Sequence, residues 1–187
     1  DNSEYNLYNL STRISSKRVV FSLNNFNDKP FMDKLLSNYK FDAVFHAAAF
    51  KHVPLTELNP FSAIKNNFIN TYWFITQVMR HRVPYFCLVS SDKAVRPTNI
   101  MGASKRLAEL SLIYLNKSKS NKSTIFNSVR FGNVINSSGS VMPLFMRQIQ
   151  NNQSLTLTHK KITRYFMTIE EAANLVLNVY KISKGGE

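Results

Sequence analysis

One segment of this 187-residue chain combines polar residue types in a spacing that suits acid–base chemistry. An apolar run ends at Val89 and is followed directly by residues 90–93, Ser-Ser-Asp-Lys. Met101 and Lys105 then stand four residues apart at the start of a helical period, so their side chains should share one helix face. The Lys105 ammonium could hold a ribose hydroxyl and lower the pKa of neighbouring groups by its charge.

Asp92 is one of only two acidic residues between Glu57 and Glu170, and the other is Glu109. A scarce carboxylate beside Lys93 at the end of a strand suits a general acid/base pair. The same residues would also serve as a helix-entry turn with a local ion pair. The residues alone leave both interpretations open.

The elements that would position this segment alternate between short apolar runs and helical periods, which predicts an α/β fold. Strands are predicted at residues 18–23, 42–48, 85–90 and 124–130. Helices are predicted at residues 28–39, from the expected cap Asn59 to residue 79, and at residues 101–117. The two long helices carry the expected core stripes, which are Phe61, Ile64, Phe68, Tyr72, Ile75 and Met79 in the first and Leu107, Leu110 and Tyr114 in the second.

This alternation predicts a Rossmann-like, doubly wound parallel sheet with ligands at the carboxyl ends of its strands, where residues 90–93 would lie. After residue 130 a helix is expected at 141–150 and a strand at 155–158. A last helix opens with the capping box Thr168-x-x-Glu171. We therefore expect one domain over residues 1–187, with about 133–187 forming a small substrate-side lobe.

None of the five glycines belongs to the Gly-rich turn that normally brings a pyrophosphate to a helix N-terminus in such folds. The first residues already suggest the helix that follows a second strand. We therefore expect the chain to begin inside a domain, and its Gly-Gly-Glu end to precede a further strand.

Composition narrows the function classes. The single cysteine, Cys87, lies in an apolar run and excludes a disulfide framework, and the four dispersed histidines predict no metal site. No signal peptide or apolar span of about 18 residues is visible, which fits a reducing cytoplasm. The net charge of +13 would suit nucleic acid, but the cations are scattered, so no nucleic-acid partner is expected.

Several motifs, in this order and spacing, resemble the CapD/WbpM-like polysaccharide biosynthesis proteins. These are extended short-chain dehydrogenases that include the UDP-N-acetylglucosamine 4,6-dehydratases. The motifs are residues 3–8 (SEYNLY), 45–54 (FHAAAFKHVP), 90–109, 130–134 (RFGNV), 137–145 (SSGSVMPLF) and 162–169 (ITRYFMTI).

The resemblance implies a role for each matching residue. Asp92 would be the acid for the C4 or C6 oxygen of the sugar, Lys93 the base at C5, and Ser91 a hydrogen-bond partner of the 4-oxygen. Met101 and Lys105 complete the implied catalytic set. The implied ligands of NAD or NADP are Asp1, His46, Ala47, Ala48, Ala49, Asn67, Ser90 and Lys105. The implied ligands of the nucleotide sugar are Lys51, His52, Arg130, Asn133 and Arg164.

Three of these assignments have structural alternatives. The alanines would serve equally in tight helix–sheet packing. His46 suits packing against the backbone better than it suits a base, and His52 suits a plain surface position.

The implied reaction is an internal redox elimination: hydride leaves C4, a proton leaves C5, hydroxide leaves C6, and hydride returns to C6. Met101 occupies the position where most short-chain dehydrogenases carry a catalytic tyrosine, and the long, membrane-anchored members of the resembled family also carry methionine there. The methionine argues against a UDP-sugar 4-epimerase, which needs the tyrosine to take the 4-hydroxyl proton.

The resemblance further implies a UDP-sugar substrate, a homo-oligomer, and a parent protein held at the inner face of the cell membrane by a preceding region. Three alternatives stay open. They are the 4-epimerase, a catalytically inactive truncated remnant, and a nucleic-acid-binding module supported by net charge alone.

Overall fold

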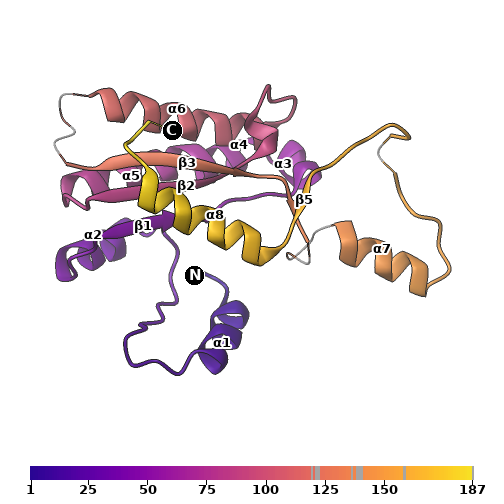
Figure 1. Ribbon diagram of the computed structural model, residues 1–187, viewed down its shortest axis with the longest axis horizontal. Helices are drawn as coiled ribbons and strands as arrows, with labels where there is room; N and C mark the ends of the chain where they lie inside the picture. Colours follow the sequence, from indigo (N-terminus) through magenta and orange to yellow (C-terminus); the bar gives the residue numbers. More distant parts are fainter. Residues whose placement is uncertain (119, 121–122, 136, 138–140, 158, 187) are drawn as a thin grey trace.

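The computed structural model describes residues 1–186 except 119, 121–122, 136, 138–140 and 158. At its centre lie three parallel strands in the order β1 (Ala43–His46), β2 (Tyr85–Ser91) and β3 (Ile125–Phe131). β2 pairs with β3 along its whole length, so the two strands end side by side. Figure 1 shows this sheet with helices above and below it. The predicted α/β fold with a parallel sheet is confirmed.

One face of the sheet is covered by α2 (Lys29–Asn38), α5 (Thr71–Arg80) and α6 (Ile100–Lys117). Asp28 begins α2 by accepting a hydrogen bond from the Phe31 N–H at 3.1 Å, as an N-cap residue does. Alternate strand residues supply the sheet side of this core. Its fully buried members include Phe86, Leu88 and Phe126 from the strands and Ile75, Val78, Ala108 and Leu112 from the helices.

α8 (Ile169–Ile182) covers the opposite face, where Val176 and Val179 pack on Tyr85, Cys87 and Val129. The predicted capping box at its start is confirmed. The Thr168 N–H donates to Glu171 Oε2 at 2.7 Å, and the Glu171 N–H donates to Thr168 Oγ1 at 3.1 Å.

The predicted helix after Asn59 is interrupted, and its predicted apolar stripe is wrong at several positions. It consists of α4 (Pro60–Ile64), a π-helical segment η1 (Lys65–Asn70) and α5. Phe61 lies before the π turns and is 88% exposed. The wider π turns rotate the side chains within and after them, so Asn67 is buried and Tyr72 is 39% exposed. Asn59 is the N-cap residue of α4, but its side chain makes no capping hydrogen bond, and its amide donates to the Leu55 carbonyl in α3 (Val53–Leu58).

The predicted face of α6 is also wrong. Leu107, Leu110 and Tyr114 are 40–66% exposed, and the buried face carries Ala108, Leu112 and Leu115. Two charged residues, Lys105 and Glu109, lie on that buried face at 6% and 2% exposure. Apolar periodicity misplaced the face because these two charges find partners at the sheet, described below.

The ends of the chain differ from expectation in two places. Residues 18–23 form no strand, and their backbone contacts Asp1 through the Ser22 carbonyl while Val20 is exposed. The first residues do form a helix, α1 (Glu4–Arg13).

The strand predicted at 155–158 is also wrong: residues 155–157 form no strand, and Thr158 lies outside the described residues. The parallel partner of β4 (Asn133–Val134) is instead β5 (Phe166–Met167), while the helix predicted at 141–150 is confirmed as α7 (Val141–Gln150). Within the described residues, no helix combines the length and apolar character needed to cross a membrane.

Candidate functional site

The connection between β2 and α6 carries most of the predicted catalytic residues. β2 ends at Ser91, a 3-10 turn (Asp92–Ala94) follows, and Asn99 caps α6 by accepting from the Gly102 N–H at 2.8 Å. A Cβ atom at Gly102 would overlap the Lys93 carbonyl oxygen and lie 2.9 Å from its carbon. Glycine therefore allows the first turn of α6 to press directly on the 3-10 turn and fix its position.

Four residues assigned to the site from sequence meet at this turn. Asp92 Oδ1 accepts hydrogen bonds from Lys93 Nζ and from Ser91 Oγ, both at 3.0 Å. Lys93 Nζ also reaches Asn133 Oδ1 at 3.4 Å, which connects β4 to the turn. Burial opposes ionisation of Asp92, but the hydrogen bond and charge of Lys93 outweigh it and lower the Asp92 pKa. The resting arrangement is thus a half-buried carboxylate–ammonium pair.

Asn67 links this region to the segment after β1. Its Oδ1 accepts from the Phe50 N–H at 2.8 Å, and its Nδ2 donates to the Phe50 carbonyl at 2.9 Å and to Ser104 Oγ at 3.1 Å. The π turn that disrupts the helix places this buried amide in that position, and such turns are frequent at functional sites. Beyond β1, Ala47 and Ala48 are exposed and Ala49 is half-buried.

Lys105 and Met101 both lie on the buried side of α6. Lys105 Nζ donates to the Val89 carbonyl at 2.7 Å, and burial lowers the Lys105 pKa to about 8, against the opposing charge of Glu109. Met101 is 3% exposed, and its carbonyl accepts from Ser104 Oγ at 2.8 Å. Lys105 therefore reaches the carboxyl end of β2, and Met101 is buried in the first turn of α6.

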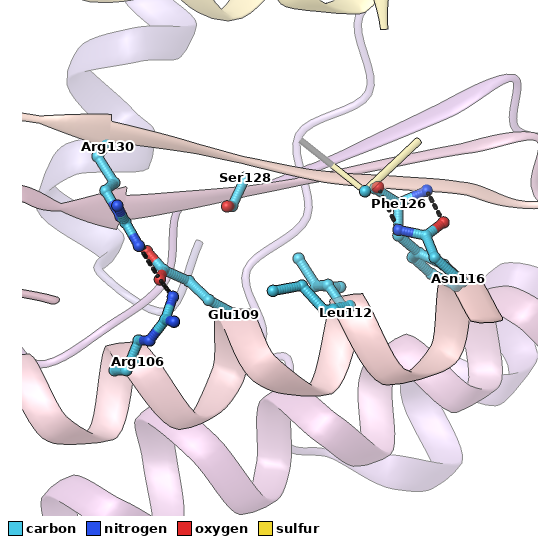
Figure 2. A pocket seen from close by; sticks show the side chains of 9 residues that line it. Arg106, Glu109, Leu112, Asn116, Phe126, Ser128 and Arg130 are labelled. Atoms are coloured by element: carbon cyan, nitrogen blue, oxygen red, sulfur yellow. Dashed lines mark hydrogen bonds and ion pairs between the residues drawn. The ribbon is translucent and has the colours of Figure 1, made fainter. Parts of the chain in front are cut away.

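Arg130 and Ser90, predicted as ligands of the sugar and of the cofactor, are both bound to Glu109. Figure 2 shows the Arg130 guanidinium reaching down from β3 to the Glu109 carboxylate on α6. Ser90 and Arg130 are paired across β2 and β3, so the single Glu109 carboxylate on α6 meets both. The free guanidinium expected for a diphosphate is an ion pair here, beside a cavity of about 330 Å³ between α6 and β3.

His46 is a packing residue. Its Nε2 lies 3.0 Å from Thr71 Oγ1, and its ring contacts Phe26, Phe74 and Phe86. Burial, with a smaller contribution from the Lys105 charge, lowers the His46 pKa to about 3. The ring is therefore neutral in the physiological range. It packs in the core, which agrees with the expectation that His46 suits packing better than it suits a base.

The remaining predicted ligands have other hydrogen-bond partners than the Asp92 turn. Lys51 Nζ donates to Ser137 Oγ at 3.4 Å, and Lys51 and the exposed His52 line a second cavity of about 510 Å³ over α3. Exposed Arg164 donates to its neighbour, the Thr163 carbonyl, at 2.9 Å. Asp1 accepts from the Ser3 N–H at 2.8 Å.

Sequence reasoning missed two residues that hold the site together. Glu109 stands out in the sequence only as a scarce acid. Its position one turn after Lys105, on the same helix face, was the signal that could have placed it at the site. Ser104, between Met101 and Asn67, gave no signal, because a serine inside a helix has no distinctive pattern.

Three relatives match all or nearly all of the chain. It is 44% identical over 187 residues to an uncharacterised membrane protein of Methanocaldococcus jannaschii, covering 100% of this chain and 56% of the relative. It is 42% identical to the capsular polysaccharide biosynthesis protein CapD of Staphylococcus aureus, covering 100% and 31%. It is 34% identical to the UDP-glucose 4-epimerase of Rickettsia canadensis, covering 93% and 50%. The chain thus spans about a third to just over half of these relatives.

Solved structures agree with the fold. Pen from Bacillus thuringiensis matches with a TM-score of 0.90 at 37% identity, covering 98% of this chain and 58% of that one. DesIV, a dTDP-glucose 4,6-dehydratase of Streptomyces venezuelae solved with NAD bound, matches with a TM-score of 0.88 at 18% identity, covering 100% and 63%. A family model described as polysaccharide biosynthesis protein matches residues 1–187. The chain therefore belongs to the polysaccharide biosynthesis protein family.

Proposed function

We propose that the protein containing this chain is a nucleotide-sugar 4,6-dehydratase acting on UDP-N-acetylglucosamine in surface polysaccharide synthesis. The observation that carries the proposal is the Asp92–Lys93 pair, joined at 3.0 Å where β2 ends and bonded to Ser91 and Asn133. Carboxyl ends of parallel strands are where ligands bind in open α/β sheets. An acid and a base side by side suit removal of water across one C–C bond.

The residues of this chain suit the nicotinamide side of a bound NAD or NADP. Exposed Ala47 and Ala48 leave the carboxyl end of β1 open to a close approach, and the Lys105 ammonium at the end of β2 is a donor for a ribose hydroxyl. When bound, the cofactor would supply hydride uptake and return. The NAD reported with the DesIV dehydratase supports this choice. The Gly-rich turn for the pyrophosphate is not among these residues.

The resting ion pair can be converted into both catalytic groups by one proton transfer. If the proton on Lys93 Nζ moves to Asp92 Oδ1, the pair becomes an amine and a carboxylic acid. Substrate that excludes water favours this neutral form, because buried charges are costly. The amine then takes the C5 proton, and the acid protonates the hydroxyl that leaves C6. After water is lost the pair is again ammonium and carboxylate. The ammonium gives its proton back to C5 as hydride returns to C6, and the amine regains a proton from solvent in place of the one that the 4-hydroxyl released when hydride left C4.

A 4-epimerase is the second candidate, supported by the Rickettsia relative of that name. Oxidation at C4 releases the 4-hydroxyl proton in both reactions, and the Met101 thioether can accept it in neither. The Asp92–Lys93 acid–base pair is what elimination needs and epimerisation does not. Met101 is also almost fully buried, which suits an apolar wall. Dehydration therefore fits the described residues better.

For the whole protein we propose association with the inner face of the membrane and assembly into a homo-oligomer. The membrane-protein description of the Methanocaldococcus relative supports the first. The exposed apolar side chains of α6, including Leu107, Leu110 and Tyr114, support the second. Light scattering of the full-length protein in detergent would test the assembly, and a monomer would contradict it.

The full-length protein should be incubated with UDP-N-acetylglucosamine and its product identified by NMR. Dehydration predicts a 4-keto-6-deoxy sugar, recognised by a new C6 methyl signal. Conversion to UDP-N-acetylgalactosamine would establish the epimerase instead. Recovery of unchanged substrate with NAD or NADP added would contradict both candidates.

A further inference from the structure

Glu109 is a buried charge that the elimination does not use. Its Oε1 accepts from Ser90 Oγ at 2.6 Å and from Arg130 Nε at 2.9 Å, and its Oε2 accepts from Arg130 at 2.7 Å and Arg106 at 2.9 Å. Figure 2 shows the two arginines on either side of the carboxylate. These four bonds occupy about all the acceptor sites of an ionised carboxylate. Burial opposes ionisation of Glu109, but the bonds from Arg130, Ser90 and Arg106 outweigh it and lower its pKa.

This anchored charge lies next to Lys105. The two residues are four apart on α6, and both are nearly fully buried, at 2% and 6% exposure. They hold consecutive residues of β2, Glu109 through the Ser90 hydroxyl and Lys105 through the Val89 carbonyl. Burial disfavours the Lys105 ammonium, and the charge of Glu109 opposes that effect.

Other charges around Lys105 act less directly. His46, whose pKa is about 3, is neutral at physiological pH. The side chains of Arg106 and Arg130 are 36% and 40% exposed, so water screens their charges. Asp92 and Lys93 beyond the strand end form their own pair. Among the described residues, Glu109 is therefore the buried anion best placed to act on Lys105.

We propose that Glu109 is a positioning residue whose fixed carboxylate keeps the buried Lys105 protonated and aimed at the end of β2. Ser90 and Arg130, on paired strands, hold the Glu109 carboxylate against the sheet, so it stays beside Lys105. Only the link to catalysis rests on the proposed function, through the Lys105 contact to the ribose. The electrostatic part concerns the protein alone.

The direct test is an NMR titration of the full-length protein labelled with ¹³C at lysine Cε, with the Lys105 signal assigned from Lys105→Arg. Glu109→Gln should lower the Lys105 pKa by about one pH unit at low salt. A Glu109 that only braced the fold would give the opposite sign. Its loss would let water reach Lys105 and raise the pKa. Glu171→Gln, at the exposed start of α8, is the matched control for loss of a carboxylate.

A second variant keeps the test decisive if Glu109→Gln does not fold. Arg106→Gln removes a partly exposed cation and one of the four hydrogen bonds to Glu109, so the less neutralised carboxylate should raise the Lys105 pKa by a few tenths of a pH unit. A Lys105 pKa that is unchanged in Arg106→Gln, or unchanged or raised in Glu109→Gln, would overturn the proposal.

The catalytic link has its own readout. With Lys105 required as an ammonium, activity falls as pH rises through its pKa, so Glu109→Gln should move the alkaline limb of kcat/KM to lower pH. An NMR shift without this movement would leave the electrostatic role standing and count against the role of Lys105 in the proposed reaction. If neither the Lys105 pKa nor the alkaline limb of kcat/KM moved, the proposed role of Glu109 would be wrong.

Discussion

Replacing Gly102 by alanine should damage the site through the backbone. The added Cβ would overlap the Lys93 carbonyl oxygen and lie 2.9 Å from its carbon, whereas carbon atoms in contact are about 3.5–4.0 Å apart. Either α6 or the 3-10 turn must retreat by at least about 0.5 Å, and the turn carries both Asp92 and Lys93. Overpacking of this kind costs about 1–3 kcal/mol, offset by about 1 kcal/mol because alanine favours the helix.

Stability should therefore fall by at most about 2 kcal/mol, while misplacement of the pair should lower kcat about 10–100-fold. Urea denaturation and the product assay on the full-length protein would measure the two effects. Lys117→Ala, at the exposed end of the same helix, is the control and should change neither. Gly102→Ala with kcat within about twofold of the parent would refute the claim that this contact positions the pair.

Three further predictions follow from the same contacts. Asp92→Asn should lower turnover about 10²–10⁴-fold with nucleotide-sugar affinity nearly unchanged, and a rate above half the parental one would contradict the acid role. Met101→Leu should keep most activity, since it conserves apolar volume, whereas near-complete loss would indicate a role for the thioether itself. The His46 pKa of about 3 lies below its unfolded value of about 6.5, so stability present above pH 6.5 is lost as pH falls towards 3. His46→Phe should therefore flatten the fall in unfolding free energy between pH 7 and 5, and an unchanged slope would show that other groups cause it.

The strand–helix alternation made the centre of the fold predictable, because the parallel strands β1, β2 and β3 coincide with short apolar runs, of which β2 is almost wholly buried. Helix faces were less predictable. On α6 the apolar residues Leu107, Leu110 and Tyr114 point outward, because the inward face holds the charges of Lys105 and Glu109. In the helix before it, the π turn at Lys65–Asn70 shifts the phase, and hydrophobic periodicity contains no signal for such a turn.

The candidate site also has a part that could be predicted from sequence and a part that could not. Ser91, Asp92 and Lys93 are neighbours in sequence, so their meeting at the end of β2 could be anticipated. The pairing of Arg130 with Glu109 could not be anticipated from sequence, because it depends on the register between β2 and β3 that sets Ser90 opposite Arg130. An arginine that sequence leaves available for a diphosphate is thereby bound to the protein itself.

The central claim, that the Asp92–Lys93 pair carries out the elimination, is tested most directly by solvent deuterium. The full-length protein and its Lys93→Ala variant should each be incubated with UDP-N-acetylglucosamine in D₂O, and C5 of product and recovered sugar examined by NMR. Our account predicts deuterium at C5 with the parent protein and none with Lys93→Ala, because the amine that exchanges this proton is gone. Equal deuterium at C5 with both proteins would contradict it.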